Sequence, residues 1–319
     1  MKEGNTLYSL LEVVAKILPI ILLLVLGNVL QKIQFFKDST INDFKKLVVN
    51  FTLPALLFLA FLDTEFESSY IIIVVVMFIA CVLMLIVGIF YKKLLKSDNR
   101  YVSTVFTSFE NGMIGYPLFV TVYGSASLYK IAVIDIGHIL FVFLILVNYL
   151  QKLNGKTSSF KELLLSFFKS PIIMAVLLGI LFSTTGSAQL MMNFQFSYSI
   201  IELLTIVGSL TVPLICIVIG YELKLDFKNI SKPFGLVLIR MSTLLVLAFL
   251  LNTFIIDGLL QLDKEFQIAL YLTFLLPPAF AIPIFMDDKS GKNKQLILNM
   301  ISINILLTIV AFLILVTVI

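Results

Sequence analysis

Long apolar segments separated by short polar connections dominate the hydrophobic pattern of the chain. Each segment is close to the ~20 residues that a helix needs to cross a bilayer. The segments cover residues 12–31, 40–62, 69–91, 101–124, 129–150, 171–186, 199–221, 233–256, 266–286 and 295–318. The pattern therefore predicts an all-α polytopic membrane protein with ten transmembrane helices.

The fourth segment is interrupted where an unbroken helix would be expected. Its centre, residues 109–118, has the sequence Phe-Glu-Asn-Gly-Met-Ile-Gly-Tyr-Pro-Leu. Gly112 and Gly115 lower the cost of leaving helical geometry, and Pro117 cannot donate to the hydrogen-bond ladder. Irregular backbone persists at membrane depth only where protein buries it or a watery cavity faces it. We expect two half-helices here, with Pro117 starting the second.

The ninth segment contains a second interruption, because Pro277, Pro278 and Pro283 fall within seven residues. Such a run cannot sit in a regular helix. If the two broken segments cross, the N-termini of their second halves point at one place in mid-membrane. That place would favour an anionic group, most simply a carboxylate, without a buried Lys or Arg. Asn111 could donate to the substrate there, or it could cap the first half-helix.

The composition supports a membrane protein, since 60% of the residues are hydrophobic and only 13% are charged. The formal net charge of +4 gives little reason to expect a nucleic-acid partner. Cys81 and Cys216 lie inside apolar segments, so neither a disulfide framework nor a metal cluster is indicated. The chain has no zinc-protease HExxH, P-loop or GxSxG motif, so we expect neither an enzyme nor a cofactor.

The basic residues are distributed unevenly between the connections. The odd-numbered connections hold 18 of the 23 Lys and Arg residues, whereas the opposite side keeps Lys2, Lys130 and Lys264. By the positive-inside rule, both termini lie outside the cytoplasm. The sequence thus predicts a multi-pass membrane protein, and its 21 lysines against two arginines favour a bacterial inner membrane.

A weak repeat appears when the first five segments are aligned with the last five. Leu26-Gly27 matches Leu178-Gly179, and residues 52–54 match residues 211–213 as Thr-x-Pro. Because five is an odd number, the halves would have opposite orientations, as in an inverted repeat. The predicted domains are residues 1–150, a cytoplasmic linker at 151–170, and residues 171–319. Within the linker, Ser159 to Glu162 resembles a capping box that opens a short amphipathic helix, either a plain connection or a regulatory element.

Four ionisable residues that lie away from the ends of the apolar segments need an explanation. Glu110, beside the first break, could couple transport to a proton or cation, or be a neutral acid bonded to a neighbouring helix. Asp135 and His138 share a helix face, so they could relay protons or buttress packing. Arg240 could pair with a carboxylate such as Asp135 or extend toward the cytoplasmic interface.

Several of these motifs resemble one family. Residues 111–118, followed by Tyr123-Gly124, are similar to the N-x-G-F-x-G-x-P-L…YG stretch of the auxin efflux carriers. Residues 51–58, Phe-Thr-Leu-Pro-Ala-Leu-Leu-Phe, resemble that family's second span, and Pro213-Leu214 with residues 219–223 resembles its seventh. Glu110 departs from the pattern, since a small residue is expected there, and this leaves the coupling mechanism in doubt.

The resemblance implies ten spans in a five-plus-five inverted repeat, the fold shared with bile acid:sodium symporters. Spans one, two, six and seven would form a scaffold, and spans three to five and eight to ten would form a mobile transport domain. A homodimer could assemble through the scaffold. Family members move organic anions, among them dicarboxylates such as malate or malonate in bacteria. The implied substrate site contains Asn111, Gly112, Gly115, Pro117, Pro278 and Pro283.

We therefore expect a secondary transporter of a small organic anion that works in the lipid bilayer by elevator-type alternating access. Proton coupling, sodium coupling and uncoupled transport all remain open. The alternatives are a sodium-coupled symporter of the bile-acid type and a membrane receptor that binds without transport.

Overall fold

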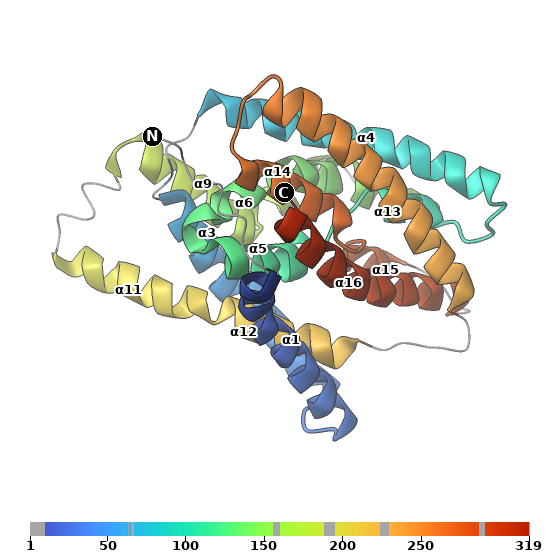
Figure 1. The fold of residues 1–319 in the computed structure, drawn as a ribbon, viewed down its shortest axis with the longest axis horizontal. Helices are drawn as coiled ribbons and strands as arrows, with labels where there is room; N and C mark the ends of the chain where they lie inside the picture. Colours follow the sequence, from blue (N-terminus) through green and yellow to red (C-terminus); the bar gives the residue numbers. More distant parts are fainter. Residues whose placement is uncertain are drawn as a thin grey trace.

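The computed structural model describes residues 10–62, 64, 67–155, 160–187, 195–223, 230–286 and 291–318. All regular secondary structure in these residues is helical (Figure 1). Seven helical runs are long and apolar enough to cross a membrane: Val14–Lys32, Asp38–Leu62, Ser68–Leu94, Ser125–Leu153, Ser197–Glu222, Ser231–Asp257 and Lys292–Val318. They coincide with seven of the ten predicted spans.

Three of these runs are single helices: α1 (Leu10–Lys32), α4 (Ser68–Leu94) and α16 (Lys292–Val318). The other four contain short turns of 3-10 or π-helix or a break between two helices. The second run consists of α2 (Asp38–Leu47), η1 (Val48–Thr52) and α3 (Leu53–Leu62), and the fourth of η4 (Ser125–Ser127), α6 (Leu128–Phe141), η5 (Val142–Leu146) and α7 (Val147–Leu153). The fifth run consists of α11 (Gln195–Ser209) and α12 (Thr211–Glu222), and the sixth of α13 (Ser231–Leu251) and η7 (Asn252–Asp257).

The remaining three predicted spans are shorter or interrupted. Residues 171–186 contain the 14-residue α9 (Pro171–Thr184). Residues 101–124 are divided into η2 (Val102–Phe106), η3 (Asn111–Gly115) and α5 (Tyr116–Tyr123), and residues 266–286 into α14 (Lys264–Leu275) and α15 (Ala281–Phe285). An all-helical membrane protein is thus confirmed, whereas ten crossings and an inverted repeat stay predictions.

One detail of the first break was predicted wrongly. Pro117 was expected to start the second half-helix, but helical backbone resumes six residues earlier, at Asn111, as the π-helical turn η3. Pro117 is the second residue of α5 and lies inside a continuous run. A π turn has i→i+5 bonds, and such turns are frequent at functional sites.

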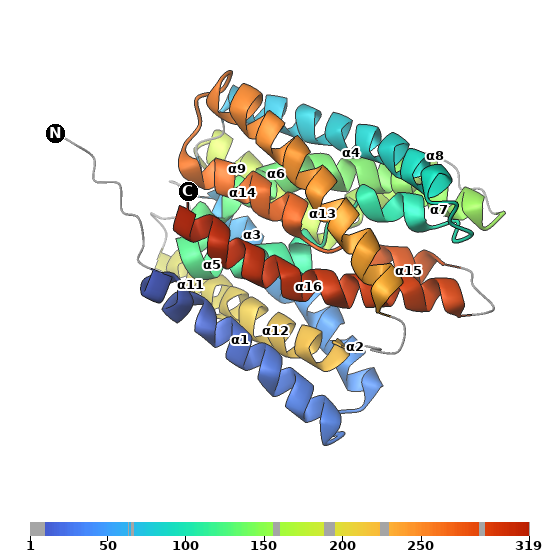
Figure 2. The same cartoon turned by 45° about the vertical axis from the view of Figure 1, so that its right-hand side comes forward.

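Helices α1 and α12 pack with their backbones in close contact. A Cβ atom added to Gly27 would lie 2.2 Å from the carbonyl oxygen of Ile217, and one added to Gly220 would lie 2.0 Å from that of Leu24. Only glycine fits at such a crossing, because any side chain would push the helices apart. Helices α3 and α9 approach each other in the same way at Gly179, where a Cβ atom would lie 2.9 Å from Phe58 O. Figure 2 shows α1 and α12 together along one edge of the molecule.

A second set of helices packs around the two interrupted segments. Helix α4 contacts α6 and η2, and α13 contacts both α14 and α16. Phe106, Ile134 and Phe274 are fully buried in this part of the core. In Figure 2, α4 lies on the edge opposite α1, and α13 crosses the view from that edge toward α16. The breaks are therefore enclosed by protein, as irregular backbone in a membrane requires.

The linker contains the predicted short helix, α8 (Phe160–Phe168). Ser159 of the predicted capping box lies outside the described residues. Phe167 is buried, with its ring 5.8 Å from that of Phe143, whereas Leu165 and Phe168 are exposed. The helix thus packs on the end of the Ser125–Leu153 run and leaves part of its apolar surface uncovered.

The outward faces of the long helices carry exposed apolar side chains, among them Leu22, Ile86, Leu203, Val246 and Ile314. Such surfaces suit lipid contact. Figure 2 shows the end of α1, helices α2, α7 and α8, and the start of α16 on one side of the molecule. The lysine-rich connections of the sequence belong to these ends.

The predicted orientation can be tested with single cysteines at exposed positions. In Lys96→Cys and Lys292→Cys, an impermeant maleimide should label the protein only from the cytoplasmic side. Gln261→Cys, at the opposite end of the helices, should be labelled from outside, and the wild type is the control because Cys81 and Cys216 are buried. Labelling of Lys96→Cys from outside in intact cells would overturn the orientation.

Candidate functional site

The two breaks are joined to each other by hydrogen bonds. The backbone N–H of Glu110 donates to the carbonyl of Pro277 at 3.0 Å. In the other direction, the N–H of Phe280 donates to Glu110 Oε2 at 2.7 Å, and that of Ala279 donates to Ser108 Oγ at 3.3 Å. Each break thus supplies part of the hydrogen bonding that the other lost when its helix ended.

The side chain of Arg240, on α13, lies between the breaks and is fully buried. Its guanidinium donates to the carbonyls of Val105 (2.6 Å) and Ser108 (3.0 Å) in the first break and of Leu276 (2.8 Å) in the second. A fourth bond, at 2.9 Å, goes to Asn304 Oδ1 on α16. Helix C-termini carry partial negative charge, so a cation is well placed there.

This position corrects two expectations from the sequence. Arg240 was expected to pair with a carboxylate or to reach the cytoplasmic interface, but its hydrogen-bond partners among the described residues are three carbonyls and an amide oxygen. The breaks were also expected to have no basic side chain nearby. That expectation is wrong, because α13 packs against both broken segments and brings Arg240 to them.

A buried network surrounds Asp135 on α6. Its Oδ1 accepts from Asn111 Nδ2 at 2.7 Å, and its Oδ2 accepts from the Tyr116 hydroxyl at 2.5 Å. His138 Nδ1 lies 2.8 Å from Oδ1, while His138 Nε2 accepts from the backbone N–H of Phe109 at 3.1 Å. Since Nε2 accepts, the proton of a neutral imidazole is on Nδ1, from which it donates to Asp135. The predicted Asp135–His138 pair is therefore present, and it is bonded to the first break.

Asn111 has both ends of its side-chain amide engaged. Besides its bond to Asp135, it accepts from the Thr273 hydroxyl of α14 at 3.2 Å, and only 1% of the residue is exposed. It therefore holds η3 in place between α6 and α14 in this structure. Its direct contact with a substrate stays a prediction.

Glu110 is partly exposed, and its carboxylate accepts from the backbone N–H of Phe280. A Cβ atom added to Gly112 would make only ordinary contacts, 3.7 Å from Leu53 Cδ2 and 4.0 Å from Glu110 Oε1. At Gly115, by contrast, a Cβ atom would lie 2.7 Å from Leu276 Cδ1, so the second break packs directly on this glycine.

The three predicted prolines lie in different surroundings. Pro117 borders a small apolar void of about 20 Å³, and Pro278 is buried in the second break. Pro283, in α15, lines a cavity of about 430 Å³. The six residues predicted for the substrate site thus all belong to the two interrupted segments. Of these six, Pro283 is the one that lines the larger cavity.

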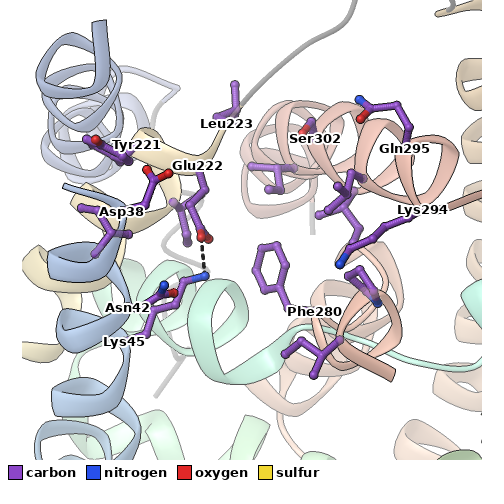
Figure 3. Close-up of a pocket in the computed structure, with 17 residues that line it drawn as sticks. Asp38, Asn42, Lys45, Tyr221, Glu222, Leu223, Phe280, Lys294, Gln295 and Ser302 are labelled. Atoms are coloured by element: carbon purple, nitrogen blue, oxygen red, sulfur yellow. Dashed lines mark hydrogen bonds and ion pairs between the residues drawn. The ribbon is translucent and has the colours of Figure 1, made fainter. Parts of the chain in front are cut away.

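This cavity lies between α2 and α12 on one side and α15 and α16 on the other (Figure 3). Lys45 of α2 and Glu222 of α12 form an ion pair within it. The Lys45 ammonium is also 5.9 Å from the centre of the Phe280 ring, which forms the wall toward the breaks. A second cavity, of about 660 Å³, lies toward the other ends of the helices and is lined by Thr64, Glu67 and Tyr129, among others.

Sequence reasoning missed Lys45, Thr273 and Asn304, as well as the role of Arg240. For Arg240 a signal existed: a permanently charged group inside an apolar segment needs several partners, and interrupted helices offer free carbonyls. Lys45 was counted only among the basic residues of a connection. Neither Thr273 nor Asn304 differs in sequence from an ordinary polar residue of a membrane helix.

The contacts of Arg240 predict a large loss of stability when it is replaced. Arg240→Gln should lower the free energy of unfolding by about 3 kcal/mol or more, because carbonyls buried at both breaks lose charged donors. The thermal denaturation midpoint of the purified protein should fall accordingly. Lys232→Gln is the control, since Lys232 is exposed on the same helix. An unchanged midpoint in Arg240→Gln would contradict the role we assign to it.

Comparison with known proteins supports a transport function for this arrangement. The family model described as membrane transport protein matches residues 12–316, nearly the whole chain. No curated protein matches the chain. The match includes both breaks and all of the residues that join them. The chain therefore belongs to the membrane transport protein family, that of the auxin efflux carriers.

Proposed function

We propose that this protein is a secondary transporter that moves a small organic anion across a bacterial inner membrane by elevator-type alternating access. The observation that carries the proposal is the pair of joined breaks, with a cavity toward each end of the helices. Transporters bind their substrates at such discontinuous helices near the middle of the membrane. A cavity at each end is what access from alternate sides requires.

The packing supports a division into a scaffold and a moving part. Helices α1, α2, α3, α9, α11 and α12 form one group of contacts, and the helices around the breaks form another. The predicted scaffold spans one, two, six and seven correspond to the first group. In an elevator mechanism the second group would move as a unit, carrying both breaks and the substrate.

The packing also supports the proposed inverted repeat. In the sequence alignment of the halves, span one corresponds to span six, and span two to span seven. Gly27 of α1 packs on α12, and Gly179 of α9 packs on α3. These are equivalent contacts between equivalent spans, as a two-fold relation between the halves would produce.

Two buried hydroxyls in the first group of helices support a binding site beside the breaks. Thr52 and Thr211 occupy equivalent places in the repeat, are at most 1% exposed, and have no hydrogen-bond partner among the described residues. Thr52 lies on η1 and Thr211 on α12. Helix α12 packs both on η1 and on η3 of the first break. Buried hydroxyls are normally bonded, so a substrate or water at this interface would satisfy them.

An anionic substrate is supported by the way the breaks bind Glu110. The backbone N–H group of Phe280 already holds a carboxylate there. Arg240 and Lys45 add positive charge nearby. A small carboxylate is therefore the substrate class that this environment favours, and malonate, malate, succinate and acetate are suitable first candidates.

The proposal is tested by uptake of these labelled anions into proteoliposomes, because a receptor would bind an anion without accumulating it. Asn111→Ala should weaken binding of a transported anion by about 1–3 kcal/mol, roughly 5- to 150-fold, since η3 loses its bonds to Asp135 and Thr273. Asn252→Ala is a matched control: Asn252 is also a buried asparagine that starts a π turn, but it bonds to Gln267 O away from the breaks.

Two results would contradict the proposal. Absence of uptake for every anion, with a folded and correctly inserted protein, would contradict transport of this class. Equal loss of affinity in Asn111→Ala and Asn252→Ala would show that the effect comes from general destabilisation of the fold and not from the breaks.

We also propose that Glu110 couples transport to a proton or a cation, since a carboxylate at this depth is costly unless it has a partner. In Glu110→Gln, substrate binding should persist while uptake loses its dependence on pH or on sodium. Glu202→Gln, an exposed carboxylate on α11, is the control. A Glu110→Gln variant with the wild-type dependence on both would make Glu110 a structural residue.

A further inference from the structure

The cavity of about 430 Å³ is lined by both polar and apolar side chains. Its polar groups come from α2, α12 and α16 and include Asn42, Lys45, Glu222, Lys294 and Gln295 (Figure 3). Its apolar side chains include Ile219, Phe280, Leu298 and Ile305. Ligand sites are typically concave, mostly apolar and supplied with a few converging polar groups. The volume is within the range of small-molecule sites.

Lys45 is the cation best placed to receive an anion in this cavity. Its side chain is 27% exposed, and that of its partner Glu222 is 33% exposed. A partly exposed ion pair contributes little net stability. An ammonium group has three donors, and one carboxylate oxygen of Glu222 accepts from it. Exchanging this partner for the carboxylate of a ligand is therefore nearly balanced in free energy.

One residue, Phe280, lies between the cavity and the breaks. The ring of Phe280 faces Lys45, with the ammonium 5.9 Å from the ring centre, while the backbone N–H of Phe280 donates to Glu110. Figure 3 shows the ammonium groups of Lys45 and Lys294 directed into the cavity near this ring. A ligand held by Lys45 would thus lie directly against the wall that separates the cavity from the breaks.

We propose that this cavity is a binding site for the transported organic anion, distinct from the breaks, in which the ligand's carboxylate displaces Glu222 from Lys45. The inference rests on the proposed transport function. Glu222 acts as an internal competitor: it neutralises Lys45 while the site is empty and yields it to the entering anion. The apolar wall accommodates the carbon skeleton, and Lys45 then passes the anion toward Phe280 and the breaks.

A competitor role and a structural role for Glu222 predict opposite results. The dissociation constant of malonate, and of acetate as a second probe, is measured by calorimetry on the purified full-length protein. Lys45→Gln should weaken binding at least tenfold, because the cation is lost. Glu222→Gln should strengthen it severalfold, because Lys45 no longer has a competing carboxylate. In the double variant binding should be as weak as in Lys45→Gln.

Lys46→Gln is the matched control, since Lys46 is the next residue on α2 and its ion pair with Asp43 is exposed at the surface. Its dissociation constant should equal that of the wild type. If Lys45→Gln does not fold, Lys45→Arg keeps the charge and should retain binding, and the Glu222→Gln measurement remains decisive by itself.

Weaker binding in Glu222→Gln would overturn the proposal, because it would mean that the ion pair merely shapes the protein. An unchanged affinity in Lys45→Gln would overturn it as well. In either case, retained uptake by the wild type would leave the proposed function standing. Loss of uptake for every anion in the wild type would instead contradict the proposed function, and this inference with it.

Discussion

Backbone groups that lose their helical partners inside a membrane must form hydrogen bonds elsewhere. Here the guanidinium of Arg240 donates to three such carbonyls. One guanidinium, in a planar fork with five donors, serves carbonyls of both breaks and an amide on α16. Among the described residues, the guanidinium is bonded to carbonyls at helix ends and to an amide oxygen, and not to a carboxylate. Without this side chain, the two interruptions would leave buried carbonyls that neither lipid nor neighbouring helices could satisfy.

Arg240 also determines how the rest of the core is arranged. It fixes η2 and the end of α14 to α13, and the Asp135 network then attaches η3 and α5 to α6. Glu110 completes the connection by accepting from the second break. Hydrogen bonds therefore join the segments around the breaks into one unit. By contrast, the close contacts that hold α1 to α12 and α3 to α9 depend on glycine.

The charges are arranged so that each buried group has a specific counterpart. Arg240 is offset by carbonyl dipoles, Asp135 by three donors, and Glu110 by the backbone N–H of Phe280. Lys45 and Glu222 form the pair that is partly exposed to a cavity. A pair at that place can exchange partners at little cost, whereas exchange at Arg240 would strand a buried charge. The Lys45–Glu222 pair therefore suits recognition of a ligand, whereas the buried Arg240 suits maintenance of the fold.

The sequence by itself determined the all-helical membrane class and the position of both breaks. Apolar length sets the spans, and the Gly- and Pro-containing stretches at residues 109–118 and 276–283 mark the two segments that are interrupted. The chain also pointed to the Asp135–His138 pair, because spacing of three on a helix is a local property. Which groups satisfy the breaks was decided by tertiary structure alone. The partners of Arg240 are 36 to 135 residues away in the chain, and Lys45 meets Glu222 across 177 residues. Such pairings depend on how helices pack, and no local pattern in one sequence records that.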